Sequence, residues 1–305
     1  MSTFWFATLG VIFALYFVLG GLDYGVALLL PTMRGEPARR AALNAIGPMF
    51  LGNEVWVVAA AGVLLAAFPG VESGLFSGTY PVLMVLLFGL VAINAAVQLR
   101  GRADRRAGFD AVITASGFVL AVGWGIVLSA LLRGLPLTAD GRVTGFAYLF
   151  GPANLLFGAT TGVLALVQGA TFLNIRIGRR LAIVAAGLVA LVLVVDRLSG
   201  PALILGGLLI VALIGVALTG SFLASSVASA LPVLIVGTAA FPAFLVSTVD
   251  PAGTISVAAG ASGDHALQVL TIAAVPLLPL LVLAQVACWW YFRRRLGGRA
   301  AAVYW

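Results

Sequence analysis

Long apolar runs separated by short polar segments follow one another along the whole sequence. A helix needs about 20 mostly apolar residues to cross a hydrocarbon core of roughly 30 Å. The runs are rich in Leu, Val, Ala and Gly and do not alternate with a period of two, so they favour helices over the strands of a membrane barrel. The pattern predicts nine spans, at residues 3–30, 49–68, 76–99, 109–132, 148–173, 181–198, 203–219, 227–249 and 267–292.

The predicted fold is therefore an all-α integral membrane protein of about nine transmembrane helices packed as helical bundles. No soluble segment or tandem repeat interrupts the pattern, so residues 1–305 are expected to form a single polytopic membrane domain. The sixth and seventh spans are short, and only a few residues around Pro201 divide them. Residues 35–46 are predicted either as a short interfacial helix that starts at Pro37 and leads into the second span, or as a plain connecting loop. Residues 250–265 form the longest polar loop.

The composition agrees with a chain that lies almost entirely in a membrane. It is 62% hydrophobic and 9% charged, whereas soluble domains devote about a quarter of their residues to charged side chains. Cys288 is the only cysteine, which excludes an intrachain disulfide. The first apolar run has no basic segment before it and no small-residue cleavage site after it, so we expect a retained helix and not a signal peptide.

Arginine side chains mark one side of the membrane. All 17 basic residues are arginines, and the alternate connections and the tail that hold most of them contain Arg34, Arg39, Arg40, Arg100, Arg102, Arg105, Arg106, Arg176, Arg179, Arg180, Arg293, Arg294, Arg295 and Arg299. The connections on the other side hold only Arg133, Arg142 and Arg197. The positive-inside rule then predicts an outer N-terminus and a cytoplasmic C-terminus, which requires an odd number of spans. The net charge of +7 thus reflects topology, and no nucleic-acid partner is expected.

Eight of the ten acidic residues lie in loops or at the ends of the predicted spans, whereas Asp23 lies in the first span and Glu54 near the start of the second. A carboxylate at membrane depth is costly unless it is paired, hydrated or protonated, so it marks a functional site by default. The alternative is that each carboxyl group is a hydrogen-bonded packing anchor that never changes its protonation.

The neighbours of these acids suggest how they are positioned. Asp23 lies in the segment Gly20-Gly21-Leu22-Asp23-Tyr24-Gly25, and small residues let a neighbouring helix approach closely. Asn53 and Trp56 are three residues apart and share one helical face, from which Glu54 points about 100° away.

Residues that could hold a redox centre are scarce. The chain has one histidine, His265 in an outer loop, and one cysteine, whereas haem needs an axial ligand and iron–sulfur clusters need several thiolates. No nucleotide-binding loop, hydrolase serine motif or zinc-protease motif occurs in a usable context. We therefore expect neither a catalytic residue nor a metal site on this chain, and another subunit would carry any redox chemistry.

The first two spans resemble a known family. The segments in question are Gly20-Gly21-Leu22-Asp23-Tyr24-Gly25-Val26, Arg39-Arg40-Ala41-Ala42-Leu43-Asn44-Ala45-Ile46-Gly47-Pro48 and Gly52-Asn53-Glu54-Val55-Trp56. In their order and spacing they are similar to the G-F-D-x-G-V, R-R-x-x-x-N-x-I-x-P and G-N-E/Q-V-W segments of subunit II of cytochrome bd-type quinol oxidase. Weaker similarity continues downstream, and the match is strongest over residues 17–80.

The chain departs from this family's pattern at several positions. Phe50 and Leu51 replace a usual Trp-Asp pair, and that aspartate is linked in the family to proton delivery. Gly20 stands where a second acid often occurs, and Gln168 replaces a frequent histidine. The loops around residues 176–226 are also shorter. These differences identify the chain as a divergent member.

The resemblance implies a subunit of a terminal oxidase in a bacterial cytoplasmic (inner) membrane, which oxidises membrane quinol and reduces dioxygen to water. In that family subunit I carries the b-type and d-type haems, while subunit II is haem-free, pairs with subunit I, supports oxygen and proton access and can bind a quinone. Asp23, Asn53 and Glu54 match polar positions of the family's motifs and become proton-pathway candidates. Trp56 matches a tryptophan near the family's oxygen route. Lipids, quinone and a small accessory subunit are the further partners implied.

Two other functions are compatible with the sequence. One is a proton-coupled secondary transporter that uses Asp23 and Glu54, although the odd span number and the lack of visible inverted halves argue against it. The other is a purely structural assembly subunit, in which both acids serve packing alone.

Overall fold

The computed structural model describes residues 1–292 and is built almost entirely of helices. Its long helices are α1 (Ser2–Leu29), α2 (Glu36–Ala67), α3 (Pro69–Arg100), α4 (Ala107–Arg133), α5 (Pro152–Phe172), α6 (Ile177–Val195), α7 (Gly200–Thr219), α8 (Phe222–Ala240), α10 (Asp264–Ala274) and α11 (Leu277–Phe292). The short elements are η1 (Leu30–Thr32), η2 (Ala147–Phe150), β1 (Ala243–Leu245), η3 (Pro251–Gly253), β2 (Ile255–Ser256) and α9 (Val257–Gly260).

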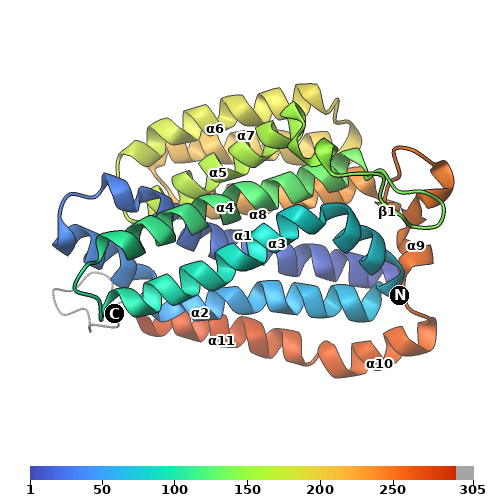
Figure 1. Cartoon of the computed structure of the whole chain (residues 1–305), viewed down its shortest axis with the longest axis horizontal. Helices are drawn as coiled ribbons and strands as arrows, with labels where there is room; N and C mark the ends of the chain where they lie inside the picture. Colours follow the sequence, from blue (N-terminus) through green and yellow to red (C-terminus); the bar gives the residue numbers. More distant parts are fainter. Residues whose placement is uncertain (293–305) are drawn as a thin grey trace.

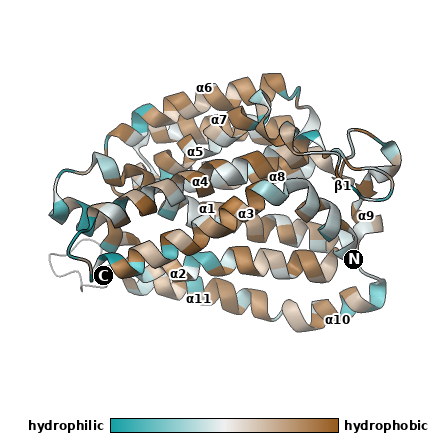
Figure 2. Ribbon diagram, in the orientation of Figure 1, coloured by the Kyte–Doolittle hydropathy of each residue, from teal (hydrophilic) through white to brown (hydrophobic). Residues whose placement is uncertain are grey.

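Nine segments of these described residues are long and apolar enough to cross a membrane, which confirms the predicted number of spans and the all-α class. The ninth segment combines α10 and α11. Hydrophobic residues make up most of the length of the helices, while many of the hydrophilic residues lie at the helix ends and in the connections (Figure 2). The start of α1 and the end of α11 lie at opposite ends of the bundle (Figure 1), as an odd number of crossings requires.

The helices enclose two main apolar cores. One core lies mostly among α1 to α4, and the second lies among α5 to α8. Helix α1 joins the two, because it packs against α2 and α4 on one side and against α5 and α8 on the other. In Figure 1, α6 and α7 form one edge of the molecule, and α10 and α11 lie along α2 at the opposite edge.

A close crossing of α1 and α5 fixes the position of the central helix. A Cβ atom added to Gly25 would overlap the carbonyl oxygen of Ala165 and lie 2.8 Å from the backbone nitrogen of Gly169. A Cβ atom at Gly169 would in turn lie 2.6 Å from the backbone nitrogen of Val26. The two backbones are thus in contact, which confirms the expectation that small residues beside Asp23 let a helix approach closely.

An ion-pair cluster ties together the ends of α2, α3 and α4. The buried guanidinium of Arg100 binds both carboxylate oxygens of Glu36, at 3.0 and 2.8 Å, and also Asp110, at 2.5 Å. Arg39 and Arg106 complete the cluster from its rim. Some arginines at this end therefore hold helices together and are more than topology anchors. The tail residues Arg293, Arg294, Arg295 and Arg299 lie outside the described residues.

At the opposite end of the bundle, Arg133 at the end of α4 forms an ion pair with Asp196 at the end of α6. Burial raises the pKa of Asp196 above its usual value, although the neighbouring Arg133 acts in the opposite direction. The same end carries the antiparallel pair of β1 and β2.

The structure corrects some of the predicted boundaries. A helix does start beside Pro37 and leads into the second span, as predicted, but the two form one continuous helix, Glu36–Ala67, so the alternative of a plain loop was wrong. The eighth span ends at Ala240 and not at residue 249, since the apolar residues that follow pair as β1. The ninth span is present as predicted, over Asp264–Phe292, but it is interrupted at Pro276, where α10 ends and α11 begins. The sixth and seventh spans are two separate helices, as predicted.

The α1–α5 crossing gives a stability prediction. We expect Gly25→Ala to lower the apparent melting temperature of the detergent-purified protein, because the added methyl group must push α5 away at a cost of about 1–3 kcal/mol. Gly187→Ala on α6 is the matched control, since a Cβ atom there meets nothing within 4 Å. Equal melting temperatures for the two variants would contradict the crossing.

Candidate functional site

Asp23 is completely buried in the middle of the protein, on the central helix α1. One of its carboxyl oxygens, Oδ2, accepts a hydrogen bond of 2.9 Å from the side-chain amide of Asn53 on α2. Its other oxygen, Oδ1, has no hydrogen-bond partner among the described residues. The structure thus brings together two of the residues selected from the sequence and leaves one carboxyl oxygen open.

The amide of Asn53 continues this contact toward α11. Gln285 donates a hydrogen bond of 2.9 Å from Nε2 to Oδ1 of Asn53, and its own Oε1 accepts one of 3.3 Å from Nε1 of Trp56. Asn53 and Trp56 therefore share one face of α2, as their spacing predicted. A polar chain therefore links α1, α2 and α11 across an otherwise apolar region, and its members are Asp23, Asn53, Gln285 and Trp56.

Glu54 lies apart from this chain. Its side chain is 8% exposed, and neither carboxyl oxygen has a hydrogen-bond partner in the part of the chain that the structure describes. The amide of Asn94 on α3 is the polar group that interacts with it. No hydrogen bond joins Glu54 to Asp23.

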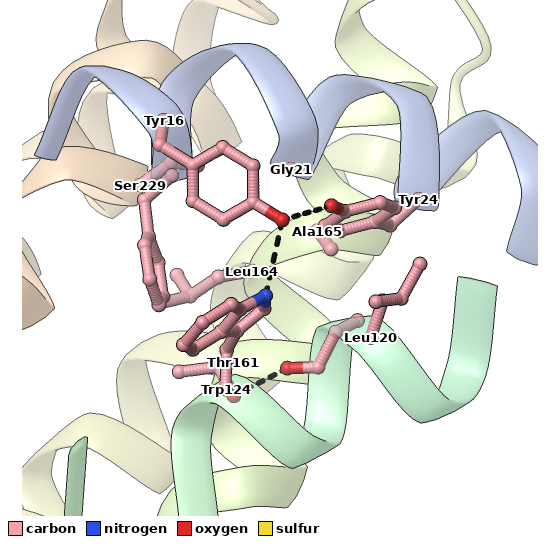
Figure 3. A pocket seen from close by; sticks show the side chains of 11 residues that line it. Tyr16, Gly21, Tyr24, Leu120, Trp124, Thr161, Leu164, Ala165 and Ser229 are labelled. Carbon is pink, nitrogen blue, oxygen red and sulfur yellow. Dashed lines mark hydrogen bonds between the residues drawn. The ribbon is translucent and has the colours of Figure 1, made fainter. Parts of the chain in front are cut away.

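A further cluster of polar side chains, which includes two tyrosines of α1, was not predicted from the sequence. The hydroxyls of Tyr16 and Tyr24 share a hydrogen bond, and Nε1 of Trp124 on α4 donates to the Tyr16 hydroxyl at 3.0 Å (Figure 3). Gly20 lies between the two tyrosines, where a Cβ atom would come within 3.1 Å of the Tyr16 ring. These residues occupy positions i, i+4 and i+8 of one helical face, and this spacing was the signal that sequence reasoning missed.

The tyrosine pair has more protons to donate than it has acceptors. Whichever hydroxyl donates to the other, one O–H proton has no acceptor among the described hydrogen bonds. Beside the pair lies a cavity of about 20 Å³ (Figure 3), and the Ser229 hydroxyl in its wall also has no partner. A space of this size holds about one water molecule, and polar walls favour its occupation.

Side chains that commonly bind metal ions are not gathered into one site in the described part of the chain. Among residues 1–292, no group of three or more His, Cys, Asp or Glu side chains could hold a metal ion. The one histidine, His265, is exposed near the start of α10, away from any buried pocket wall.

Comparisons with known proteins agree on one family. The family model for cytochrome bd terminal oxidase subunit II matches residues 1–292. The chain is 27% identical to cytochrome bd ubiquinol oxidase subunit 2 of Bacillus subtilis over 98% of both chains. It is 32% identical to cytochrome bd-I ubiquinol oxidase subunit 2 of Escherichia coli, over 56% of this chain and 48% of that protein.

A solved structure extends the similarity to the fold. The structure of bd oxidase from Geobacillus thermodenitrificans matches with a TM-score of 0.73 over 97% of this chain and 98% of that chain, at 16% identity. Nothing in these comparisons supports the transporter that the sequence left open. The chain belongs to the cytochrome bd terminal oxidase subunit II family.

Proposed function

We propose that the chain serves proton and oxygen access in a bd-type quinol oxidase complex without carrying a haem itself. Its curated relatives are named as subunits of ubiquinol oxidases, which pass electrons from quinol to dioxygen. Reduction of dioxygen to water consumes protons as well as electrons, so the complex needs a route for each. Haem b and haem d then belong to the partner, subunit I, and this chain completes a heterodimer that a small accessory subunit and a bound quinone can extend.

The observation that carries the proton proposal is the set of open carboxyl oxygens in the membrane interior. Oδ1 of Asp23 and both oxygens of Glu54 are buried without hydrogen-bond partners among the described residues. Buried polar atoms rarely stay without a partner, because the loss of hydration is costly. A water molecule would donate a hydrogen bond to such an oxygen, and a bound proton would remove the buried charge of the carboxylate. Both possibilities make the acids suitable for taking up and releasing protons, with Asn53 orienting Asp23.

The position of Leu51 agrees with a proton route that begins at a different residue than in most members of the family. Leu51 stands where the family usually has an aspartate, and its side chain is 54% exposed on the surface of α2. No carboxyl group is available at that point of the helix. We infer that proton transfer in this member depends more strongly on Asp23 and Glu54.

Trp56 supports a place for dioxygen. Its buried indole lines an apolar cavity of about 430 Å³ between α1, α2 and α11, together with Leu15, Val18, Leu19, Val282, Gln285, Val286, Trp289 and Trp290. Dioxygen is apolar, so it partitions into such a space more readily than charged species do. We propose that this cavity belongs to the oxygen route.

The distribution of arginine supports an orientation in the membrane. The arginine-rich connections lie at one end of the bundle and the N-terminus lies at the other. By the positive-inside rule the N-terminus faces outward and the end of α11 faces the cytoplasm. The membrane would be the bacterial cytoplasmic membrane.

Substitution of the two acids tests the proton proposal. We expect Asp23→Asn and Glu54→Gln each to lower quinol-dependent oxygen uptake by about tenfold or more, because an amide cannot accept and release the proton. Asp104→Asn, at an exposed position between α3 and α4, is the control and should keep the wild-type rate. The rates are compared in complexes whose haem content equals that of the wild type. Wild-type turnover in both acid variants would favour a purely structural role.

A substitution that narrows the cavity tests the oxygen proposal. Val286→Trp adds bulk beside Trp56 and should raise the KM for oxygen by a few-fold while kcat at saturating oxygen stays the same. Leu283→Trp is the matched control, because Leu283 lies on the same helix and does not line the cavity. An unchanged KM for oxygen in Val286→Trp would refute the route.

A further inference from the structure

An apolar groove of about 490 Å³ lies on the surface formed by α1, α4 and α8. Its wall is almost free of polar groups and includes Phe6, Gly10, Phe13, Leu131, Val233 and Gly237. A Cβ atom at Gly10 meets nothing within 4 Å, so the groove is open at this point. Its apolar lining suits a hydrocarbon chain.

A polar pocket of about 600 Å³ adjoins this groove. Arg133, Asp196, Arg197, Ser199 and Thr238 contribute to its wall. The groove and the pocket are continuous, because Pro201 and Thr238 line both of them. The pocket lies where α4, α6 and α8 end and α7 begins, which is the depth of lipid headgroups.

The charges in this pocket leave one cation uncompensated. Arg133 is paired with the carboxylate of Asp196. Arg197 is exposed and makes no ion pair with a described residue. The other arginine of the connections at this end, Arg142, is paired with Asp140. The pocket therefore has a net positive charge next to an apolar groove.

We propose that the groove and the pocket together bind one anionic phospholipid, with an acyl chain along α1 and α8 and its headgroup phosphate at Arg197. An apolar channel that ends at an uncompensated cation is complementary to an amphiphile with a negative head. A quinone has a neutral head and would leave Arg197 without a counter-ion, so the charge favours the phospholipid. The site is separate from Asp23 and Glu54 and does not depend on the proposed proton or oxygen routes.

Native mass spectrometry of the assembled complex tests this site. The complex is depleted of lipid in detergent and titrated with phosphatidylglycerol or with phosphatidylcholine of the same acyl chains. We expect the wild type to retain one phosphatidylglycerol with about fivefold preference over phosphatidylcholine. Arg197→Gln should abolish this preference, and Gly10→Leu should weaken the binding of both lipids by filling the groove.

Two matched variants control for general effects on assembly. Arg142→Gln removes a paired arginine at the same end of the bundle, and Gly187→Leu adds the same side chain at an open position of α6. Both should bind lipid as the wild type does. Wild-type phosphatidylglycerol binding in Arg197→Gln and Gly10→Leu would overturn the proposal. Retention of a quinone that competes with phosphatidylglycerol for the site would also overturn it.

Discussion

The backbone contact between α1 and α5 at Gly25 and Gly169 is the constraint on which the arrangement of the interior depends. It fixes the height and rotation of α1 in a protein where α1 joins both apolar cores. Because Asp23 is two residues from Gly25, the same contact fixes the depth of its carboxyl group. Gly25 therefore helps to position Asp23, since a bulkier residue in its place would push the helices apart and move the carboxyl group away from Asn53.

The polar side chains of α1 point toward different neighbouring helices. Asp23 turns toward the amides of α2 and α11, while Tyr16 and Tyr24 meet Trp124 of α4. Glu54 lies on α2, and its side chain is near Asn94 of α3. Helix α1 thus places several polar side chains in the membrane interior, where the surrounding helices are otherwise apolar. Several of these groups have no hydrogen-bond partner among residues 1–292, and water is the usual partner of such buried polar groups.

Much of this architecture could be predicted from the sequence, because membrane burial is a local property of composition. The nine spans, the burial of Asp23 and Glu54, and the common face of Asn53 and Trp56 all follow from run length and helical period. The contact with Gln285 could not be predicted, since it joins positions more than 200 residues apart. The end of α8 was misplaced for a related reason: an apolar strand and an apolar helix look alike when the residues that pair with the strand are unknown.

We propose that this chain supplies buried proton-exchanging groups while a partner subunit supplies the haems, so that the chain works only within the complex. Purification from its native membrane in mild detergent, followed by an absorption spectrum of each separated subunit, tests this claim directly. We expect a large membrane partner to co-elute with this chain. The intact complex should show haem b and haem d bands and quinol-dependent oxygen uptake. After separation, this chain should be colourless. Haem that stays on this chain, or a colourless preparation without a partner, would contradict it.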